Sequence, residues 1–538
     1  MTEPEGGVAT GSSNAGAPRT GRGAAFVAAG ILISRMTGLV RSRVFAHYFG
    51  LQNDAADAFM AAVRIPNVLQ NLFGEGALSA SFIPVYASLL ARGDRREADR
   101  VAGAIASLLV LMVATFVLVG VLATPLLIDL IAPGFRGEKR ALTIAIVRVL
   151  FPGTGILVIS AWCLGILNSH HRFLLSYASG VMWNVGMIGA LVVFGPHTAL
   201  PRLAVLLAWG SVVGSALQLL IQLPVVLSVA PDLRFALDTT SEQVRAVARN
   251  FMPAFVSRGV VQASAYIDAF LASWLPTGAV TGLGNAQLLY TLPVSLFGMS
   301  VAAAELPAMS GVVGSDSTST DALRRRLDAG LRRIAFFVVP SAMAFLALGD
   351  IVAAAVLQTG RFRHEDAVYV WMILAGSAVG LLASTLGRLY SSAYYALRDT
   401  RTPVRYAVVR LVLTTVLGYL FAIPLPRWLG VPPAWGAAGL TASAGLAAWA
   451  EMLLLRATLN GRIGQTGLPA TYMAKLWGAA AAAATAAWAV KLAVPAWHPI
   501  ATGLLVLGPY GAVFFAMTFV MRVPEASAAV LTLTRRRN

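Results

Sequence analysis

The first long apolar run of the chain, residues 24–48, reads AAFVAAGILISRMTGLVRSRVFAHY. It is long enough to cross a membrane as a helix, but it carries Arg35 near its middle. A guanidinium in hydrocarbon costs at least about 2.5–3.5 kcal/mol, and it does not deprotonate. Arg35 is therefore expected to face a partner or a water-filled cavity, which makes it a candidate site residue. The alternative is an arginine at a helix end whose side chain snorkels to the headgroups.

The whole chain has the composition of a membrane protein. Of its 538 residues, 57% are hydrophobic and 12% are charged, and apolar runs of about 20 residues recur along it. Because the backbone must satisfy its own hydrogen bonds in lipid, we predict an all-α integral membrane protein with about 14 transmembrane helices. The alternating pattern of barrel strands is absent from the sequence.

The distribution of charge and cysteine narrows the function further. The formal net charge is +17, but the basic residues are dispersed between the apolar runs, which argues against nucleic-acid binding. They concentrate in the loops of one side, so the positive-inside rule places the N- and C-termini in the cytoplasm. The single cysteine, Cys163, permits neither a disulfide within the chain nor a thiol metal site.

Short motifs recur at nearly one offset. Ser34-Arg35 returns as Ser257-Arg258, and Leu-Phe-Gly at 72–74 returns at 296–298. We predict two six-helix lobes in the same topology, as in transporters whose substrate site lies between parallel repeats; the alternative is chance similarity between apolar helices. The predicted parts are a disordered tail 1–23, an N-lobe 24–230, a C-lobe 231–460, a C-terminal helix pair 461–525 and a basic tail 526–538.

The second apolar run contains many polar residues, in the stretch RIPNVLQNLFGEGALSASFIPVY at 64–86. Arg64, Asn67, Asn71 and Glu75 follow helical spacing, which predicts one polar face toward a cavity. Prolines and glycines in this stretch would bend the helix, as suits a gate. The alternative for Gln70 and Asn71 is ordinary hydrogen bonding between helices. Glu75 needs a partner, and Arg35 is the nearest candidate by topology; that pair could be purely structural.

Two further acids lie in apolar runs, Asp268 and Glu305. Each is expected to pair with a basic residue, to bind a cation, or to carry a proton if it is neutral and buried. The sequence contains no nucleophile triad, phosphate-binding loop or dinucleotide-binding turn, which argues against an enzyme.

Several stretches resemble the MurJ/MviN family of bacterial lipid II flippases, within the multidrug/oligosaccharidyl-lipid/polysaccharide exporter superfamily. The most specific are SRMTGLVRSRVFA at 34–46, FGEGALSASFIPVY at 73–86 and RDTRTPV at 398–404. The resemblance implies fourteen helices around a central cationic cavity in the bacterial cytoplasmic membrane. It implies that undecaprenyl-pyrophosphate-linked muropeptide moves from the inner to the outer leaflet by alternating access, for cell wall synthesis, with cell-wall synthesis proteins as further partners. The residues that match the family's functional positions are Ser34, Arg35, Arg41, Asp57 and Glu75.

The sequence departs from that family in two places. Basic residues often precede the conserved Phe-x-Glu-Gly-Ala segment, but here Gln70 and Asn71 stand there, and Leu288 stands where the eighth helix often has an arginine. We hypothesise that Arg258 replaces the lost charge. Asp268 matches a carboxylate that binds sodium in some members, with Thr414 and Gly418 at the partner positions. Gly418 offers no side-chain ligand, so the sequence argues against sodium coupling; we expect no cofactor, and the membrane potential as the driving force.

Three other functions stay open from the residues alone: export of another polyprenyl-linked glycan or of an amphipathic drug, a transport-dead scaffold for envelope assembly, and an enzyme that processes polyprenyl phosphates. The predicted substrate-binding residues are Ser34, Arg35, Arg41, Asp57, Arg64, Asn67, Gln70, Asn71, Glu75 and Arg258. Asp268 and Glu305 are candidates for ion or proton coupling, and we predict no catalytic or metal site.

Overall fold

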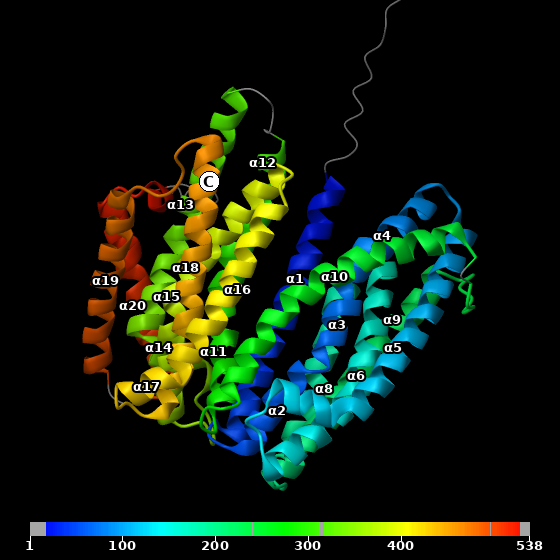
Figure 1. Ribbon diagram of the computed structural model, residues 1–538, viewed down its shortest axis with the longest axis horizontal. Coiled ribbons are helices and arrows are strands. Elements are labelled where there is room, and N and C mark those ends of the chain that lie inside the picture. The colour runs from blue at the N-terminus through cyan, green and yellow to red at the C-terminus, as the bar shows by residue number, and fades with distance from the viewer. Residues whose placement is uncertain (1–17, 239, 312–316, 495–496, 528–538) are drawn as a thin grey trace, which may run out of the picture.

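The computed structural model describes residues 18–238, 240–311, 317–494 and 497–527. Within helices, the side chains of residues 18–29, 31, 75–77, 79–80, 177, 253–265 and 317 lie outside this description. Apart from one isolated bridge between Thr359 and Phe362, the regular structure of the described residues is helical (Figure 1). The predicted all-α class is therefore confirmed.

The helices form two bundles and a C-terminal pair. The first bundle contains α1 Pro18–Phe49, α2 Asp54–Arg64, α3 Asn67–Phe73, α4 Glu75–Ala91, α5 Arg95–Ile131, α6 Gly137–Ser169, α7 Phe173–Ala178, α8 Gly180–Phe194 and α9 Leu200–Val229. The second contains α11 Ala279–Pro293, the π-helical segment η1 Val294–Met299, α12 Ser300–Ser310, α13 Ser317–Ala347, α14 Gly349–Leu357, α15 His364–Ala396, α16 Arg401–Ala422, α17 Pro424–Trp428, the 3-10 turn η2 Pro433–Trp435 and α18 Gly436–Ile463. The C-terminal pair is α19 Ala470–Ala493 and α20 Pro499–Val520.

Both bundles use one packing scheme. In the first, α9 packs closely on α6 and α8, and α5 packs on α6. In the second, α18 packs closely on α15 and α16, and α13 packs on α15. Counted along the chain, these are equivalent helices of the two halves, so the structure supplies the parallel repeat that the short motifs indicated.

Helix α10, Glu242–Ala272, connects the bundles (Figure 1). Its first part packs against α4 and α5, and Val244 and Val247 belong to the first apolar core. Its last part contacts α16 and α18, and Leu271 and Ala272 belong to the second core. The helix is therefore shared between two cores, one built mainly from α1–α9 and the other mainly from α11–α20.

Length and apolarity identify the membrane-crossing helices. Among the described residues, 11 helical stretches are long and apolar enough to span a membrane. The three other predicted spans are α1, the α2–α4 segment and α10, and they contain Arg35, Arg64 and Arg258.

The backbone is irregular at the same motif in both halves. The break between α3 and α4 falls at Gly74, where an added Cβ would collide with the backbone carbonyl of Gln70. In the second bundle, η1 begins directly after Pro293 and contains Leu296-Phe297-Gly298. Proline lacks an N–H and interrupts the helical hydrogen-bond ladder, which accounts for a local change to π geometry.

Candidate functional site

Arg35 lies on α1 of the first bundle and reaches the second bundle. Its Nη1 donates a hydrogen bond of 3.1 Å to Ser295 Oγ in η1. The Arg35 side chain is exposed, and the described side chains provide it with no carboxylate partner. A guanidinium between two bundles, held by a neutral hydroxyl, keeps its full positive charge available to an anion.

Ser34 and Arg41 occupy the other side of α1, within the first bundle. Ser34 lies against Gly180 at the start of α8. The guanidinium of Arg41 stacks over the Trp183 ring, 4.8 Å from its centroid, and Nη1 lies 4.0 Å from Met187 Sδ. Cation–π contact stabilises a charge where no carboxylate is present, so Arg41 contributes positive charge near the α1–α8 contact.

The second segment does not form one continuous polar face. It is divided at Ile65-Pro66 and again at Gly74, so Arg64 ends α2, whereas Asn67 and Asn71 share a face of α3. Gln70 and Asn71 are exposed, and Asn67 and Arg64 are half-buried. The expected bend is present, but it interrupts the helical register on which the four-residue face was based. The side chains of Glu75 and Arg258, two further predicted site residues, lie outside the described residues.

Asp268 belongs to a group of charges between the helices. It is close enough to Arg64 and Arg410 to interact with both electrostatically, and Arg410 Nη1 lies 3.0 Å from Glu451 Oε2. Tyr266 donates a hydrogen bond of 3.0 Å to the Arg64 carbonyl. Among the described residues, Oδ1 of Asp268 has no hydrogen-bond partner. The first bundle, α10 and the second bundle therefore share one network of charges.

Three other positions singled out in the sequence take separate places. Glu305 lies 3.7 Å from the largely exposed Arg333, which fits the expected pairing with a basic residue. Thr414 is buried in α16, and Gly418 packs against Leu271 and Leu440. Across the chain that the structure describes, no cluster of three or more potential metal ligands occurs.

Asp57 joins the two bundles at one end of the molecule. Its buried carboxylate accepts hydrogen bonds from Lys139 Nζ at 2.9 Å, from the N–H groups of Gly278 and Thr281 at 2.9 Å, and from Thr281 Oγ1 at 2.7 Å. Gly278 has φ +98° and precedes α11, a left-handed conformation that favours glycine. A carboxylate at a helix N-terminus satisfies free N–H groups and complements the helix dipole, so Asp57 of one bundle caps a helix of the other.

A second clamp at this end has the opposite polarity. Arg43 donates hydrogen bonds to the carbonyls of Ala355, Val356 and Gln358 at the C-terminal end of α14, at 3.0, 2.9 and 3.3 Å. Nearby, His47 Nδ1 lies 3.0 Å from Thr359 Oγ1. A cation is stabilising at a helix C-terminus. We call the contacts of Asp57 and Arg43 with the second bundle the junction; Figure 1 shows the bundles closest near α2 and α11, and farther apart toward α4 and α12.

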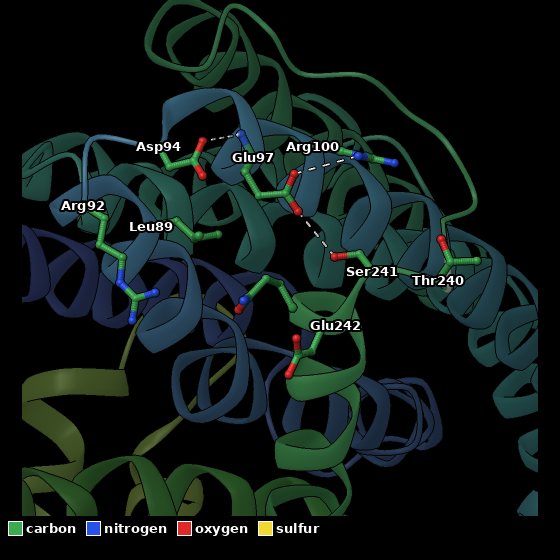
Figure 2. A pocket seen from close by; sticks show the side chains of 9 residues that line it. Leu89, Arg92, Asp94, Glu97, Arg100, Thr240, Ser241 and Glu242 are labelled. Atoms are coloured by element: carbon green, nitrogen blue, oxygen red, sulfur yellow. Dashed lines mark hydrogen bonds and ion pairs between the residues drawn. The ribbon is translucent and has the colours of Figure 1, made fainter.

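The described ranges also include an open surface pocket of about 580 Å³, between the α4–α5 turn and the start of α10 (Figure 2). Arg100 binds Asp238 at 3.0 Å, and Ser241 donates to Glu97 at 3.4 Å. Hydrogen bonds from Thr240 lower the pKa of Asp238. These groups satisfy one another and fasten the start of α10 to the first bundle, away from Arg35.

Comparison with known proteins identifies the fold and the family. A family model described as lipid II flippase MurJ matches residues 45–513. The chain belongs to the MurJ family. The lipid II flippase MurJ of Burkholderia cenocepacia is 31% identical over 431 residues, covering 79% of this chain and 80% of that protein. The probable lipid II flippase MurJ of Vibrio cholerae is 30% identical over 439 residues, covering 80% and 81%.

Solved structures agree at the level of fold. A lipid II flippase MurJ in an inward closed conformation has a TM-score of 0.74 at 20% identity, covering 92% of this chain and 98% of that chain. An inward-facing multidrug MATE transporter of the MOP superfamily has a TM-score of 0.62 at 16% identity, covering 79% and 98%. The predicted MurJ-family membership is confirmed, and it makes this chain a multi-pass membrane transporter rather than an enzyme.

Sequence reasoning missed several residues of the candidate site. Arg410 and Glu451 are charged residues inside predicted spans, so the criterion that selected Arg35 would have found them. Arg43 and Lys139 carried no comparable signal, because basic residues near span ends are ordinary. Ser295 could have been found from its place directly before the second Leu-Phe-Gly motif, where Asn71 stands in the first.

Proposed function

We propose that the protein carries lipid II, or a closely related undecaprenyl-diphosphate muropeptide, from the inner to the outer leaflet of the bacterial cytoplasmic membrane. The observation that carries the proposal is the exposed Arg35 guanidinium, which lies between the two bundles of a MurJ-family fold and has only a hydroxyl partner among the described side chains. Arginine offers a planar fork of donors that matches phosphate oxygens. The polyprenyl tail stays in lipid while the headgroup passes between the bundles.

The proposed cycle is alternating access between the N-lobe and the C-lobe, with boundaries near 24–230 and 231–460. The distribution of Arg and Lys favours cytoplasmic termini and a junction on the outer side of the membrane. The opposite end, where the bundles are farther apart, is then open to the inner leaflet. Outward opening then requires the contacts of Asp57 and Arg43 with the second bundle to break. In this scheme Asp57 holds the closed state and does not bind the headgroup.

We assign different roles to the remaining predicted site residues. We assign Arg41 and Arg64 to the positive potential around the headgroup, and Asn67, Gln70 and Asn71 to neutral hydrogen bonding with its sugar or peptide. Asp268 carries the coupling between α10 and the two bundles through its charged neighbours. For Ser34 and Glu75 the support is the family resemblance, in which both match functional positions.

The proposal is tested by depleting the protein in its own cells and measuring which leaflet holds the accumulated lipid-linked sugar. We expect the lipid-linked sugar to accumulate in the inner leaflet. The wild-type chain should restore its transport, whereas Arg35→Ala should not. Arg405→Ala is the matched control, because Arg405 is an exposed arginine at the start of α16. Unchanged transport of lipid II on depletion, or accumulation of a different glycan, would favour export of another polyprenyl-linked glycan or of an amphipathic drug. Normal growth of charge-neutral variants would favour a scaffold.

Arg258 is proposed as the second phosphate-binding charge. The support is the repeat, which makes Ser257-Arg258 the counterpart of Ser34-Arg35, together with the leucine at 288. Arg258→Ala should abolish complementation while the purified variant still folds, as judged by its thermal unfolding. Wild-type complementation by this variant would refute the role.

A further inference from the structure

The π-helical segment η1 brings one polar side chain to Arg35. Ser295 is the second residue of η1, directly after Pro293 and Val294. Pro293 cannot donate to the preceding turn, and the wider π turn accommodates that loss. Ser295 is half-buried and stands directly before Leu296-Phe297-Gly298, as the exposed Asn71 stands before Leu72-Phe73-Gly74. Each bundle thus presents one neutral polar residue at a backbone irregularity.

The hydroxyl of Ser295 both accepts and donates a hydrogen bond. Its oxygen accepts the bond of 3.1 Å from Arg35 Nη1, and the hydroxyl donates to the Leu292 carbonyl at 3.2 Å. A single hydrogen bond of this kind is modest in strength, whereas a carboxylate at the same place would neutralise the guanidinium and form a charge-assisted pair. The contact therefore orients Arg35 and leaves its charge and its other N–H donors available to an anion.

The surroundings suit a lipid diphosphate better than a free anion. Ile33 and Met36 on α1 are exposed, and so are Leu296 and Met299 on η1. These side chains are close to Arg35 and to Ser295 in the chain, so they can contact the first isoprene units while the phosphate oxygens meet the charge.

We infer that Ser295 is a positioning residue for the lipid diphosphate: from the opposite bundle it holds one N–H of the Arg35 guanidinium, so that the other N–H groups are oriented toward a phosphate oxygen. The inference rests on the proposed function and adds a specificity element to it. Arginine has five N–H donors, so Arg35 can keep its bond to Ser295 while its other N–H groups meet the phosphate, and the Ser295 hydrogen stays on the Leu292 carbonyl. The headgroup is then held by Arg35, which stays joined to the second bundle through Ser295.

The test is equilibrium binding of lipid II, with undecaprenol as the lipid lacking phosphate, to the full-length protein in nanodiscs. Ser295→Ala should weaken lipid II binding about two- to tenfold, the range expected for one hydrogen bond. Ser295→Thr should restore it, because the hydroxyl is kept. Ser295→Asp should weaken it by at least about tenfold, since a carboxylate competes with phosphate for Arg35. Undecaprenol binding should be unaffected by any of the three.

Two controls separate positioning from a structural role. Ser300→Ala removes a hydroxyl that donates to the Leu296 carbonyl one turn earlier, and it should bind lipid II normally. On an Arg35→Ala background, Ser295→Ala should cause no further loss, because Ser295 acts through Arg35. Normal lipid II binding by Ser295→Asp, or an undiminished Ser295→Ala effect without Arg35, would overturn the inference. Failure of the wild-type chain to prefer lipid II over undecaprenol would overturn the proposed function and the inference with it.

Discussion

At the scale of single residues, four of the charges inside the membrane form one group. Arg64 and Arg410 both interact with the Asp268 carboxylate, and Arg410 also binds Glu451 at 3.0 Å. Two cations and two anions in one place nearly balance, which lowers the cost of each in a medium of low dielectric constant. A free cation at Asp268 would have to compete with arginines that are already part of the chain.

The Arg410–Glu451 pair provides the first prediction. Arg410→Gln or Glu451→Gln alone should lower the temperature of thermal unfolding, because each leaves the other charge without its partner. The double variant should recover part of that loss. Thermal unfolding of the four proteins in detergent completes the cycle, and strictly additive losses would show that the two residues do not stabilise one another.

At the scale of elements, capping explains one of the specific motifs. In RDTRTPV, the Asp399 carboxylate accepts hydrogen bonds from the N–H groups of Arg401 and Thr402 at 3.0 Å and from Thr402 Oγ1 at 2.7 Å. It also binds Arg462 of α18 at 2.7 Å. These contacts, led by the Thr402 backbone, lower the pKa of Asp399 to about 2. One residue therefore starts α16 and attaches it to α18.

The lowered pKa gives a prediction with a definite sign. Because the folded protein holds the Asp399 proton more weakly than the unfolded chain does, its ionised form stabilises the fold above the ordinary aspartate pKa of about 4. That contribution is lost as the pH falls toward about 2. Asp399→Asn should therefore unfold at a lower temperature than wild type at pH 7, and the gap should narrow below about pH 4. Thermal unfolding as a function of pH tests this, and a gap that persists at low pH would contradict it.

At the scale of the molecule, the junction holds the two bundles together at one end by the ends of two helices. Asp57 binds the start of α11, and Arg43 binds the end of α14. Both clamps depend on charges meeting helix termini, so they are directional and break as units when a bundle rotates. Transport by alternating access would have to open this end once in every cycle.

Locking the junction should stop transport. Asp54 and Thr277 meet across it, with Thr277 Oγ1 donating to Asp54 Oδ1 at 2.8 Å, and the lone native cysteine is buried. Asp54→Cys combined with Thr277→Cys should lose lipid II transport on oxidation and regain it on reduction, whereas either single variant should respond to neither treatment. Full transport by the oxidised double variant, with the cross-link verified by mass, would show that this end does not open.

The membrane potential supplies the last prediction. Moving one negative charge outward is favoured by about 2.3 kcal/mol per 100 mV of inside-negative potential, and a diphosphate headgroup carries more than one such charge. In vesicles containing the purified protein, clamping the potential to zero should slow lipid II movement, while replacing sodium should not. Undiminished movement at zero potential would rule out potential as the driver.

The sequence by itself determined the class of the fold and which charged residues are candidates for the site. Apolar runs of membrane length must be helical because lipid offers no hydrogen bonds to the backbone. An arginine such as Arg35 in such a run is costly unless it faces a partner or a water-filled cavity. The resemblance, carried by a few specific stretches, then indicated the family that the comparisons confirmed. These conclusions depend on the apolarity and charge of residues that are close together in the chain, which the sequence alone shows.

The tertiary structure decided which groups meet. It placed Asp57 at the start of α11, Arg43 at the end of α14 and Ser295 beside Arg35, and it shared α10 between both cores. No spacing in the sequence could predict these contacts, because each joins residues more than 200 positions apart and depends on how two separately packed bundles are oriented. Periodicity reports the face of one helix, whereas the partner across a bundle interface is fixed by packing.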